Sequence, residues 1–439
     1  MKRFWLILLS LVFITVFSTT VFAADVKFSG EYYAAGVYLD KTSLKKDTSN
    51  DGPSTAFYFQ RLRVRTDFIV SPGLTLITRF DALERVWGGP RSSAATTLAA
   101  DSSGTISENE NIAFDWAYIN YKSPIGVFDV GIMNDGSTGT IFGNSYKPSA
   151  RIKYAYVTGP FKIALAYTKV KEKNLTATSP TVTYTDADND KYGILGEYMW
   201  KDGKAGINVN YYRYAENRPS ANNKKVYTLF TPYAIAKIGP VALQAELNYA
   251  VGKYQDYEDT TTDVKIREWT GWIDATATFG PVYFGGTFAY VSGDDPTTTT
   301  KREGGDINGG NDWNPCLILF NYYDRTYWIG ALAGQGGSTN SGPMTNAFFY
   351  QGRIGLRPIA DLDIMASLAY AKADEKPTGY AENDYGYEVD VTATYKITNN
   401  LFYMLGVGYL FTGDYFKGTD SVSKIDDNYM VINKLTLTF

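Results

Sequence analysis

The last residues of the chain, Tyr429-Met-Val-Ile-Asn-Lys-Leu-Thr-Leu-Thr-Phe439, alternate between apolar and polar side chains and stop on an aromatic ring. Successive side chains of a strand point to opposite faces, so the apolar set shares one face. The members of this set are Tyr429, Val431, Leu435, Leu437 and Phe439. Lys434, Thr436 and Thr438 share the other face. This pattern predicts the last strand of a transmembrane β-barrel, although a water-soluble β-sandwich produces the same alternation.

The start of the chain agrees with this prediction. Lys2 and Arg3 precede an apolar run that ends at Val21-Phe22-Ala23, which predicts a secretory signal peptide over residues 1–23. No other segment has the run of about 20 apolar residues that a membrane helix needs. An exported chain without such a helix can cross lipid as a closed barrel, because every backbone polar group must be paired there. We therefore expect residues 24–439 to form one barrel domain.

The composition restricts the chemistry that the chain can perform. It has no histidine, which excludes His-dependent catalytic triads, haem ligation through histidine and most zinc sites. Cys316 is the sole cysteine and is interpreted as incidental. Asp186, Asp188 and Asp190 have the spacing of a calcium loop, but Lys191 stands where the turn needs glycine. We expect no enzyme activity, no cofactor, no bound metal and no nucleic-acid partner.

Short turn signals alternate with longer polar stretches along the chain. Gly, Pro or Asn mark eight short turns, at 71–73, 123–126, 158–160, 201–204, 238–240, 279–281, 357–361 and 398–400. Nine longer stretches lie at 40–55, 88–108, 135–147, 174–187, 217–223, 257–263, 294–342, 375–382 and 415–423. These 17 connections predict an all-β, up-and-down antiparallel barrel of 18 strands, with both termini at the short-turn end. Sixteen strands are the alternative.

A run of arginines marks the second predicted strand. Arg61, Arg63 and Arg65 share one face, and each would cost about 2–4 kcal/mol facing lipid near the midplane, so they should face the lumen. The next predicted strand has further charged side chains on the same, inner face, and later strands add more basic side chains to that face. These residues are Arg79, Asp81, Arg85, Arg151, Lys153 and Arg353. Such a ladder beside a narrow aqueous path favours anions.

Acidic side chains with inward parity lie on other predicted strands: Asp115, Asp129, Glu197, Glu246, Glu388 and Asp390. A basic wall opposite an acidic wall would create a transverse field across the pore. In the alternative interpretation, the arginines pair with Asp67, Asp81 and other carboxylates and only fill the interior.

The longest connection, 294–342, is expected to be an extracellular loop. Loops of this length in a compact unit are usually functional or disordered. The apolar run after Pro315 argues against disorder, so the preferred interpretation is a loop that folds into the barrel mouth as a constriction or lid. Extra strands above the membrane, or a 20-strand barrel, are the alternatives.

The signal peptide, the strand ending in Phe439 and the Phe59-Gln-Arg-Leu-Arg-Val-Arg65 strand resemble Gram-negative outer-membrane porins. The arginine ladder and the Gly293-Asp-Asp-Pro296 loop are similar to alginate-export-like and OprD-like 18-strand channels. The resemblance implies a passive outer-membrane channel for small hydrophilic solutes, with a bias toward anions or carboxylates. It also implies contact with lipid and lipopolysaccharide, and assembly by the barrel-insertion machinery through Phe439.

Two other functions stay open at this stage. One is a barrel sleeve around a partner such as a multihaem cytochrome, which a wide lumen would favour. The other is a polysaccharide export channel. The sequence also leaves open whether the barrel is a monomer or a homotrimer.

Overall fold

The computed structural model describes residues 25–46, 52–88, 112–136, 139–143, 147–173, 187–218, 221–305 and 310–439. The predicted signal peptide at 1–23 lies outside these residues. No helix in the described part of the chain has the length and apolar character needed to cross a membrane.

Eighteen long antiparallel strands form one closed sheet in the described residues. They are β1 (Asp25–Leu39), β3 (Thr55–Ser71), β4 (Leu74–Val86), β5 (Ile112–Ser123), β6 (Gly126–Asn134), β7 (Pro148–Thr158), β8 (Phe161–Lys171), β9 (Asn189–Trp200), β10 (Gly203–Tyr214), β11 (Asn223–Ile238), β12 (Val241–Tyr257), β13 (Val264–Phe279), β14 (Val282–Val291), β18 (Ala347–Ile359), β19 (Leu362–Lys372), β20 (Asp384–Thr398), β21 (Leu401–Thr412) and β23 (Asn428–Thr438). The 18-strand prediction is confirmed, and the 16-strand alternative is wrong.

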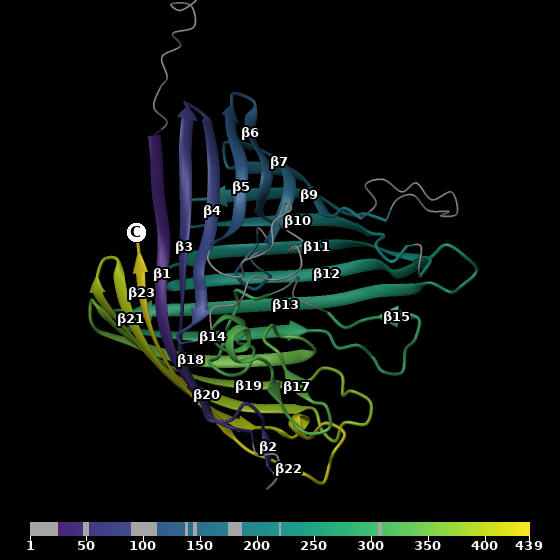
Figure 1. Ribbon diagram of the computed structural model, residues 1–439, viewed down its shortest axis with the longest axis vertical. Coiled ribbons are helices and arrows are strands. Elements are labelled where there is room, and N and C mark those ends of the chain that lie inside the picture. The colour runs from purple at the N-terminus through teal and green to yellow at the C-terminus, as the bar shows by residue number, and fades with distance from the viewer. Residues whose placement is uncertain are drawn as a thin grey trace, which may run out of the picture.

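The sheet closes where the last strand meets the first. Strand β1 pairs with β3 on one side and with β23 on the other, and Tyr38 lies opposite Val431 in the second pair. Figure 1 shows β23, in yellow, beside β1, in purple. The backbone N–H of Phe439 donates to the carbonyl of Gly30 at 3.1 Å, which extends the pairing to the final residue. The closed sheet has no free edge.

The short turns lie where the sequence predicts them. Each of the eight turn signals joins two paired strands, and β1 begins and β23 ends at the same end of the barrel as these turns. Gly239 and Gly280 have φ values of +60° and +59°, in the left-handed region that glycine enters at no steric cost. Each is followed by a proline, Pro240 or Pro281, which has no N–H to contribute to a strand ladder. This pair of residues ends one strand and starts the next.

The longer connections contain short strands and helical turns. The connection between β14 and β18 contains β15 (Lys301–Arg302), β16 (Leu332–Ala333), β17 (Thr339–Asn340) and two helical turns, η1 (Tyr322–Thr326) and α2 (Tyr327–Ile329). The others are β2 (Lys45–Lys46), β22 (Lys424–Ile425) and η2 (Asp414–Lys417).

Strand β21 shows how the outer face is built. Its outward side chains are exposed in the order Tyr403, Leu405, Val407, Tyr409 and Phe411. Aliphatic residues therefore occupy the middle of the strand and aromatic residues its two ends, which is the arrangement of a lipid-facing band between two aromatic girdles. Of the intervening inward residues, Gly406, Gly408 and Leu410 are buried and Met404 is partly buried.

This arrangement predicts that a charged side chain on the outer face of β21 destabilises the barrel more at the middle of the strand than near its end. Val407→Arg, at the middle, should lower the free energy of unfolding in phospholipid vesicles by about 2–4 kcal/mol. Tyr409→Arg, one outward position further along, should cost less, because the cost falls toward the interface. Urea titration of the refolded barrel, followed by tryptophan fluorescence, measures both. Equal small costs at the two positions would contradict a lipid midplane at Val407.

Candidate functional site

The connection between β14 and β18 turns into the barrel. Its segment Cys316–Phe320 is buried, and Ile318 and Leu319 have no exposed surface. This segment belongs to one apolar cluster with inward-facing side chains of the surrounding strands, which include Ala289, Phe349, Ala369, Ala371, Leu410, Met430 and Ile432. The loop therefore fills part of the lumen.

Polar groups of the wall hold this loop in place. Glu388 on β20 accepts hydrogen bonds from the backbone N–H groups of Ile318 at 2.6 Å and Leu319 at 2.7 Å. The side-chain amide of Gln351 on β18 donates to the carbonyl of Pro315 at 2.6 Å. Hydrogen bonds to a charged acceptor are stronger than neutral ones, so the carboxylate is an effective anchor for backbone that has left the sheet.

Arg325 fixes the loop from within. Its guanidinium is fully buried and donates to the carbonyls of Ile318 at 2.6 Å, Gly330 at 3.1 Å and Asn340 at 3.2 Å. Burial lowers the pKa of Arg325 to about 10, while the nearby charge of Glu388 opposes the shift. The side chain therefore stays charged near neutral pH and connects three separate parts of the loop.

A second loop also turns inward, which the sequence analysis did not predict. Residues 139–143, between β6 and β7, meet Glu246 on β12, which accepts from the backbone N–H of Thr140 at 2.6 Å and from its hydroxyl at 2.8 Å. A Cβ at Gly139 or Gly143 would collide with the Glu246 carboxylate, so glycine at both positions lets this carboxylate approach the loop backbone.

The two inward loops touch through aromatic rings. Phe142 of the second loop stacks on Trp272 of β13 with a centroid distance of 5.8 Å. It also meets the edge of Trp313, from the longer loop, at 5.1 Å. Phe142 has no exposed surface. The two loops thus pack against each other inside the lumen.

These contacts correct part of the predicted pore lining. Glu246, Glu388 and Asp390 do point inward, but they are only 3%, 0% and 3% exposed. The inward loops cover all three carboxylates, so they anchor loops and do not line an aqueous path.

The space beside the longer loop is a cavity of about 340 Å³. The barrel wall contributes Arg61, Arg63, Arg79, Trp116 and Lys434 to its lining, and the loop contributes Asp312, Tyr323 and Asp324. One side of the cavity is therefore basic and the other acidic. A contact of 3.1 Å between Lys434 and Asp324 joins the two sides.

The lumen-facing arginines of β3 and β4 also contact carboxylates. Arg63 makes two hydrogen bonds of 2.6 Å to Asp81 on β4. Arg79 lies 3.1 Å from Asp115 and stacks over the ring of Trp116 at 4.0 Å.

Two members of the ladder differ from these. Arg61 is held more loosely, at 3.6 Å from both Glu31 and Glu84. Arg65 pairs with Asp67 on its own strand at 2.8 Å and does not line the cavity.

Arg85 departs from its predicted place. An irregularity in the β3–β4 ladder sets Ala82 opposite Leu62 and Arg85 opposite Gln60, and Leu83 between them has a φ of +52°. Residues paired in this way share a face, and Gln60 alternates with the inward Arg61. Arg85 therefore has the outer parity, which corrects the prediction that it faces the lumen. Glu84 takes the inward position beside Arg61.

The later basic residues form a second cavity of about 230 Å³. Arg151, Lys153, Lys162 and Lys191 line it together with Asp135 and Asn134, and Asn134 also lines the first cavity. Asp135 lies 3.2 Å from Arg151 and 2.7 Å from Lys191. Sequence reasoning missed Lys162 and Lys191, although both have inward parity.

The remaining predicted residues are fixed by local ion pairs. Lys153 lies 3.2 Å from Asp129, and Arg353 lies 2.7 Å from Asp274 on β13. Glu197 lies 3.1 Å from Lys204.

Two of the aspartates with calcium-loop spacing, Asp188 and Asp190, form ion pairs with a lysine. Lys169 lies 2.7 Å from Asp188 and 3.1 Å from Asp190, so one lysine bridges the two carboxylates. Asp186 lies outside the described residues.

No protein-family model and no curated protein matches the chain. Among solved structures, OccK2 (OpdF) of Pseudomonas aeruginosa matches with a TM-score of 0.52 and 10% identity, over 94% of this chain and 98% of that one. A variant of OccD1 (OprD) matches with a TM-score of 0.51 and 13% identity, over 95% and 98%.

A third structure is the complex of OccK2 with glucuronate. It has a TM-score of 0.51 and 10% identity, and the match covers 96% of this chain and 99% of that one. At these identities the likeness establishes the fold alone. The OprD-like resemblance that the sequence motifs indicate is confirmed at this level: the chain has the closed barrel fold of these outer-membrane porins.

Proposed function

We propose that this chain is a passive outer-membrane channel for small hydrophilic solutes that favours anions, and carboxylates in particular. The observation that supports it is the cavity where the inward loops narrow the lumen, because three guanidiniums and Lys434 line its wall side. Charge close to a narrow aqueous path determines which ion enters. The carboxylate partners Glu31, Asp81 and Asp115 are absent from the lining of this cavity, so a solute meets the guanidiniums first.

Arg61 is the strongest candidate for direct contact with a solute. Its contacts to Glu31 and Glu84 are 3.6 Å long, beyond hydrogen-bonding distance. A guanidinium offers donors in a planar fork that matches the two oxygens of a carboxylate. A passing carboxylate can therefore bind to Arg61 without first displacing a tight wall partner.

The loop side of the cavity opposes the wall side. Asp312 and Asp324 face the arginines across the cavity, which sets up a transverse field. A solute with both an anionic and a cationic group would align its carboxylate with Arg61 and Arg63 and its cation with the loop. A plain anion would follow the wall.

The filled lumen favours diffusion over the two alternative functions. A sleeve must leave room for a guest protein, whereas the loops at 139–143 and 316–320 are packed inside the described lumen. An exporter of a polyanion needs a continuous basic lining, and Asp312 and Asp324 interrupt it here.

The solved structures of this fold point the same way. They are porins, which are channels and not enzymes, and OccK2 was crystallised with glucuronate, a sugar carboxylate. We infer the carboxylate class for this chain from the Arg61 cavity. We also infer an outer-membrane location, with lipid and lipopolysaccharide around the barrel and Phe439 as the assembly signal.

The first prediction of this function concerns ion selectivity. Replacing Arg61, Arg63 and Arg79 with alanine removes three charges from the lining and leaves Asp81 and Asp115 without their pairs. Each charge is worth about 1 kcal/mol at contact distance in water, so the anion-to-cation permeability ratio should fall more than about tenfold. The reversal potential in a planar bilayer under a salt gradient measures this ratio. Arg65→Ala is the matched control and should change it little, since Arg65 does not line the cavity.

Three results of that experiment would refute all or part of the proposal. A wild-type barrel that never conducts would refute the channel function itself. A conducting wild-type barrel with cation preference, or a triple variant with unchanged reversal potential, would refute the anion selectivity and leave the channel intact.

The second prediction concerns the size of the opening. Glu246→Gln removes the charge that holds Thr140, and hydrogen bonds to a charged group contribute about 1.5–3 kcal/mol. The 139–143 loop should then spend time out of the lumen, so single-channel conductance should rise and the current should become noisier. Glu197→Gln is the control, because its partners lie on the wall, at Lys204 and Tyr233. Identical traces for Glu246→Gln and wild type would show that this loop does not limit the current.

A further inference from the structure

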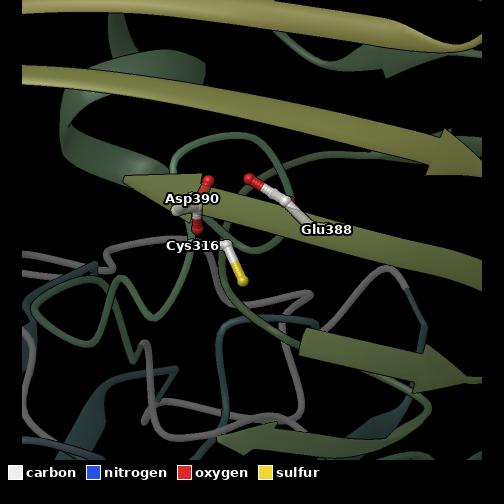
Figure 2. Close-up of side chains that lie close together, drawn as sticks. All are labelled: Cys316, Glu388 and Asp390. Carbon is white, nitrogen blue, oxygen red and sulfur yellow. The ribbon is translucent and has the colours of Figure 1, made fainter. Parts of the chain in front are cut away.

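A buried cluster outside the solute path combines one thiol with two carboxylates. Cys316 lies on the inward loop, and Glu388 and Asp390 lie on β20 (Figure 2). One ligand atom from each residue lies within 4.8 Å of the other two. All three residues are buried. The proposed passage of anions makes no use of them.

The charges of this cluster are not balanced by neighbouring side chains. Neither Glu388 nor Asp390 makes an ion pair with any lysine or arginine in the described part of the chain. Arg325 is a buried cation of the same loop, and its donors bind the oxygens of Ile318, Gly330 and Asn340. Two ionised carboxylates beside this one guanidinium would leave an excess negative charge. Buried charges of this kind are normally paired or bound to a metal.

Asp390 has an oxygen that lacks a hydrogen-bond partner. Its Oδ2 accepts from the backbone N–H of Leu317 at 3.3 Å, while its buried Oδ1 has no partner. Gly408 on the neighbouring β21 leaves the space beside this atom open. A Cβ at Gly408 would lie 2.5 Å from Asp390 Oδ1 and 3.4 Å from Glu388 Oε1. Leu317 Cβ would lie 3.1 Å from the same position, so glycine at 408 keeps the side of Asp390 Oδ1 free of a further side chain.

The dimensions of the cluster fit a transition-metal ion. Three atoms that lie within 4.8 Å of one another have a common centre no more than about 2.8 Å from each. Zinc binds sulfur at about 2.3 Å and carboxylate oxygen at about 2.0–2.2 Å, so small side-chain movements complete the site. A thiolate is a poor ligand for magnesium or calcium and a good one for zinc. A dication, a thiolate, two carboxylates and Arg325 also sum to zero charge.

We propose that Cys316, Glu388 and Asp390 bind one divalent cation of the zinc type, which ties the inward loop to the barrel wall. The same carboxylates accept the backbone N–H groups of Leu317, Ile318 and Leu319, which orient them as outer-shell hydrogen bonds orient metal ligands. Three protein ligands leave a position for water. The proposal is independent of solute selectivity, because the site lies beneath the loop and away from Arg61.

Metal content of the folded barrel tests this proposal. The full mature chain, refolded with zinc and freed of excess metal, should retain about one zinc per barrel by elemental analysis. Cys316→Ser and Asp390→Asn should each lower the zinc content to background, with folding checked by the heat-dependent shift in gel mobility. Asp129→Asn is the matched control, a buried lumen aspartate whose partner is Lys153, and should keep the metal.

A spectroscopic measurement on the unaltered chain decides the case if a variant fails to fold. Cobalt(II) loaded in place of zinc should give a near-ultraviolet charge-transfer band from the Cys316 thiolate. A wild-type barrel without bound metal, without this band, or with equal zinc in all variants would overturn the proposal. So would an infrared band of a protonated carboxyl group in the zinc-loaded barrel that Glu388→Gln abolishes, since the two carboxylates would then share a proton instead of a cation.

Discussion

The structure depends on one constraint, which is that backbone N–H and C=O groups have no water to bind inside lipid. A sheet meets it only if its two edges pair with each other. The pairing of β1 with β23 along residues 31–39 therefore closes the barrel and pairs the two strand edges that would otherwise be free. The outer face follows from the same constraint, because the side chains that alternate out of a closed sheet must be apolar. Strand β21, with Leu405 and Val407 between aromatic ends, is the direct result.

Closure of 18 strands creates a second problem, since a barrel of this size has a lumen too wide for its own side chains to fill. Two loops fill it here. Backbone that enters the lumen needs hydrogen-bond partners, and Glu246 and Glu388 supply them from the wall. Arg325 supplies them from within the longer loop. The buried charges are thus a consequence of using irregular chain to narrow a regular barrel.

The sequence predicted the barrel well because its signals are local. Three residues, such as Ile238-Gly-Pro240, are enough to identify a turn. The cost of placing a charge in lipid assigns Arg61, Arg63 and Arg65 to the inner face of the strand. Local parity failed at Arg85, where the irregular register near Leu83 exchanges inside and outside. No pattern of apolar and polar residues marks such an irregularity.

The alternation of residues along a strand also predicts which face a side chain occupies, but not whether that side chain is covered by a loop or exposed to water. It correctly placed Glu246, Glu388 and Asp390 on the inner face, yet it could not tell an anchor beneath a loop from a residue in water. A signal was present on the partner strands. The inner faces of β19 and β21 carry Ala369, Ala371, Gly406 and Gly408, which are small for a wall beside water. These small residues leave room on the wall for the apolar run after Pro315 to pack against it.

The two interpretations of the arginine ladder, as scaffold and as selectivity element, turn out to be compatible. A long guanidinium side chain left free in water would sample many rotamers, and an ion pair reduces that freedom. Asp81 holds Arg63 by two hydrogen bonds while the guanidinium still lines the cavity. Arg65 binds Asp67 through the same two donors, Nε and one terminal nitrogen, yet it does not line this cavity. Under the proposed function, what separates a solute-binding arginine from a structural one is therefore its position at the cavity, because the hydrogen bonds to the carboxylate partner are the same in both.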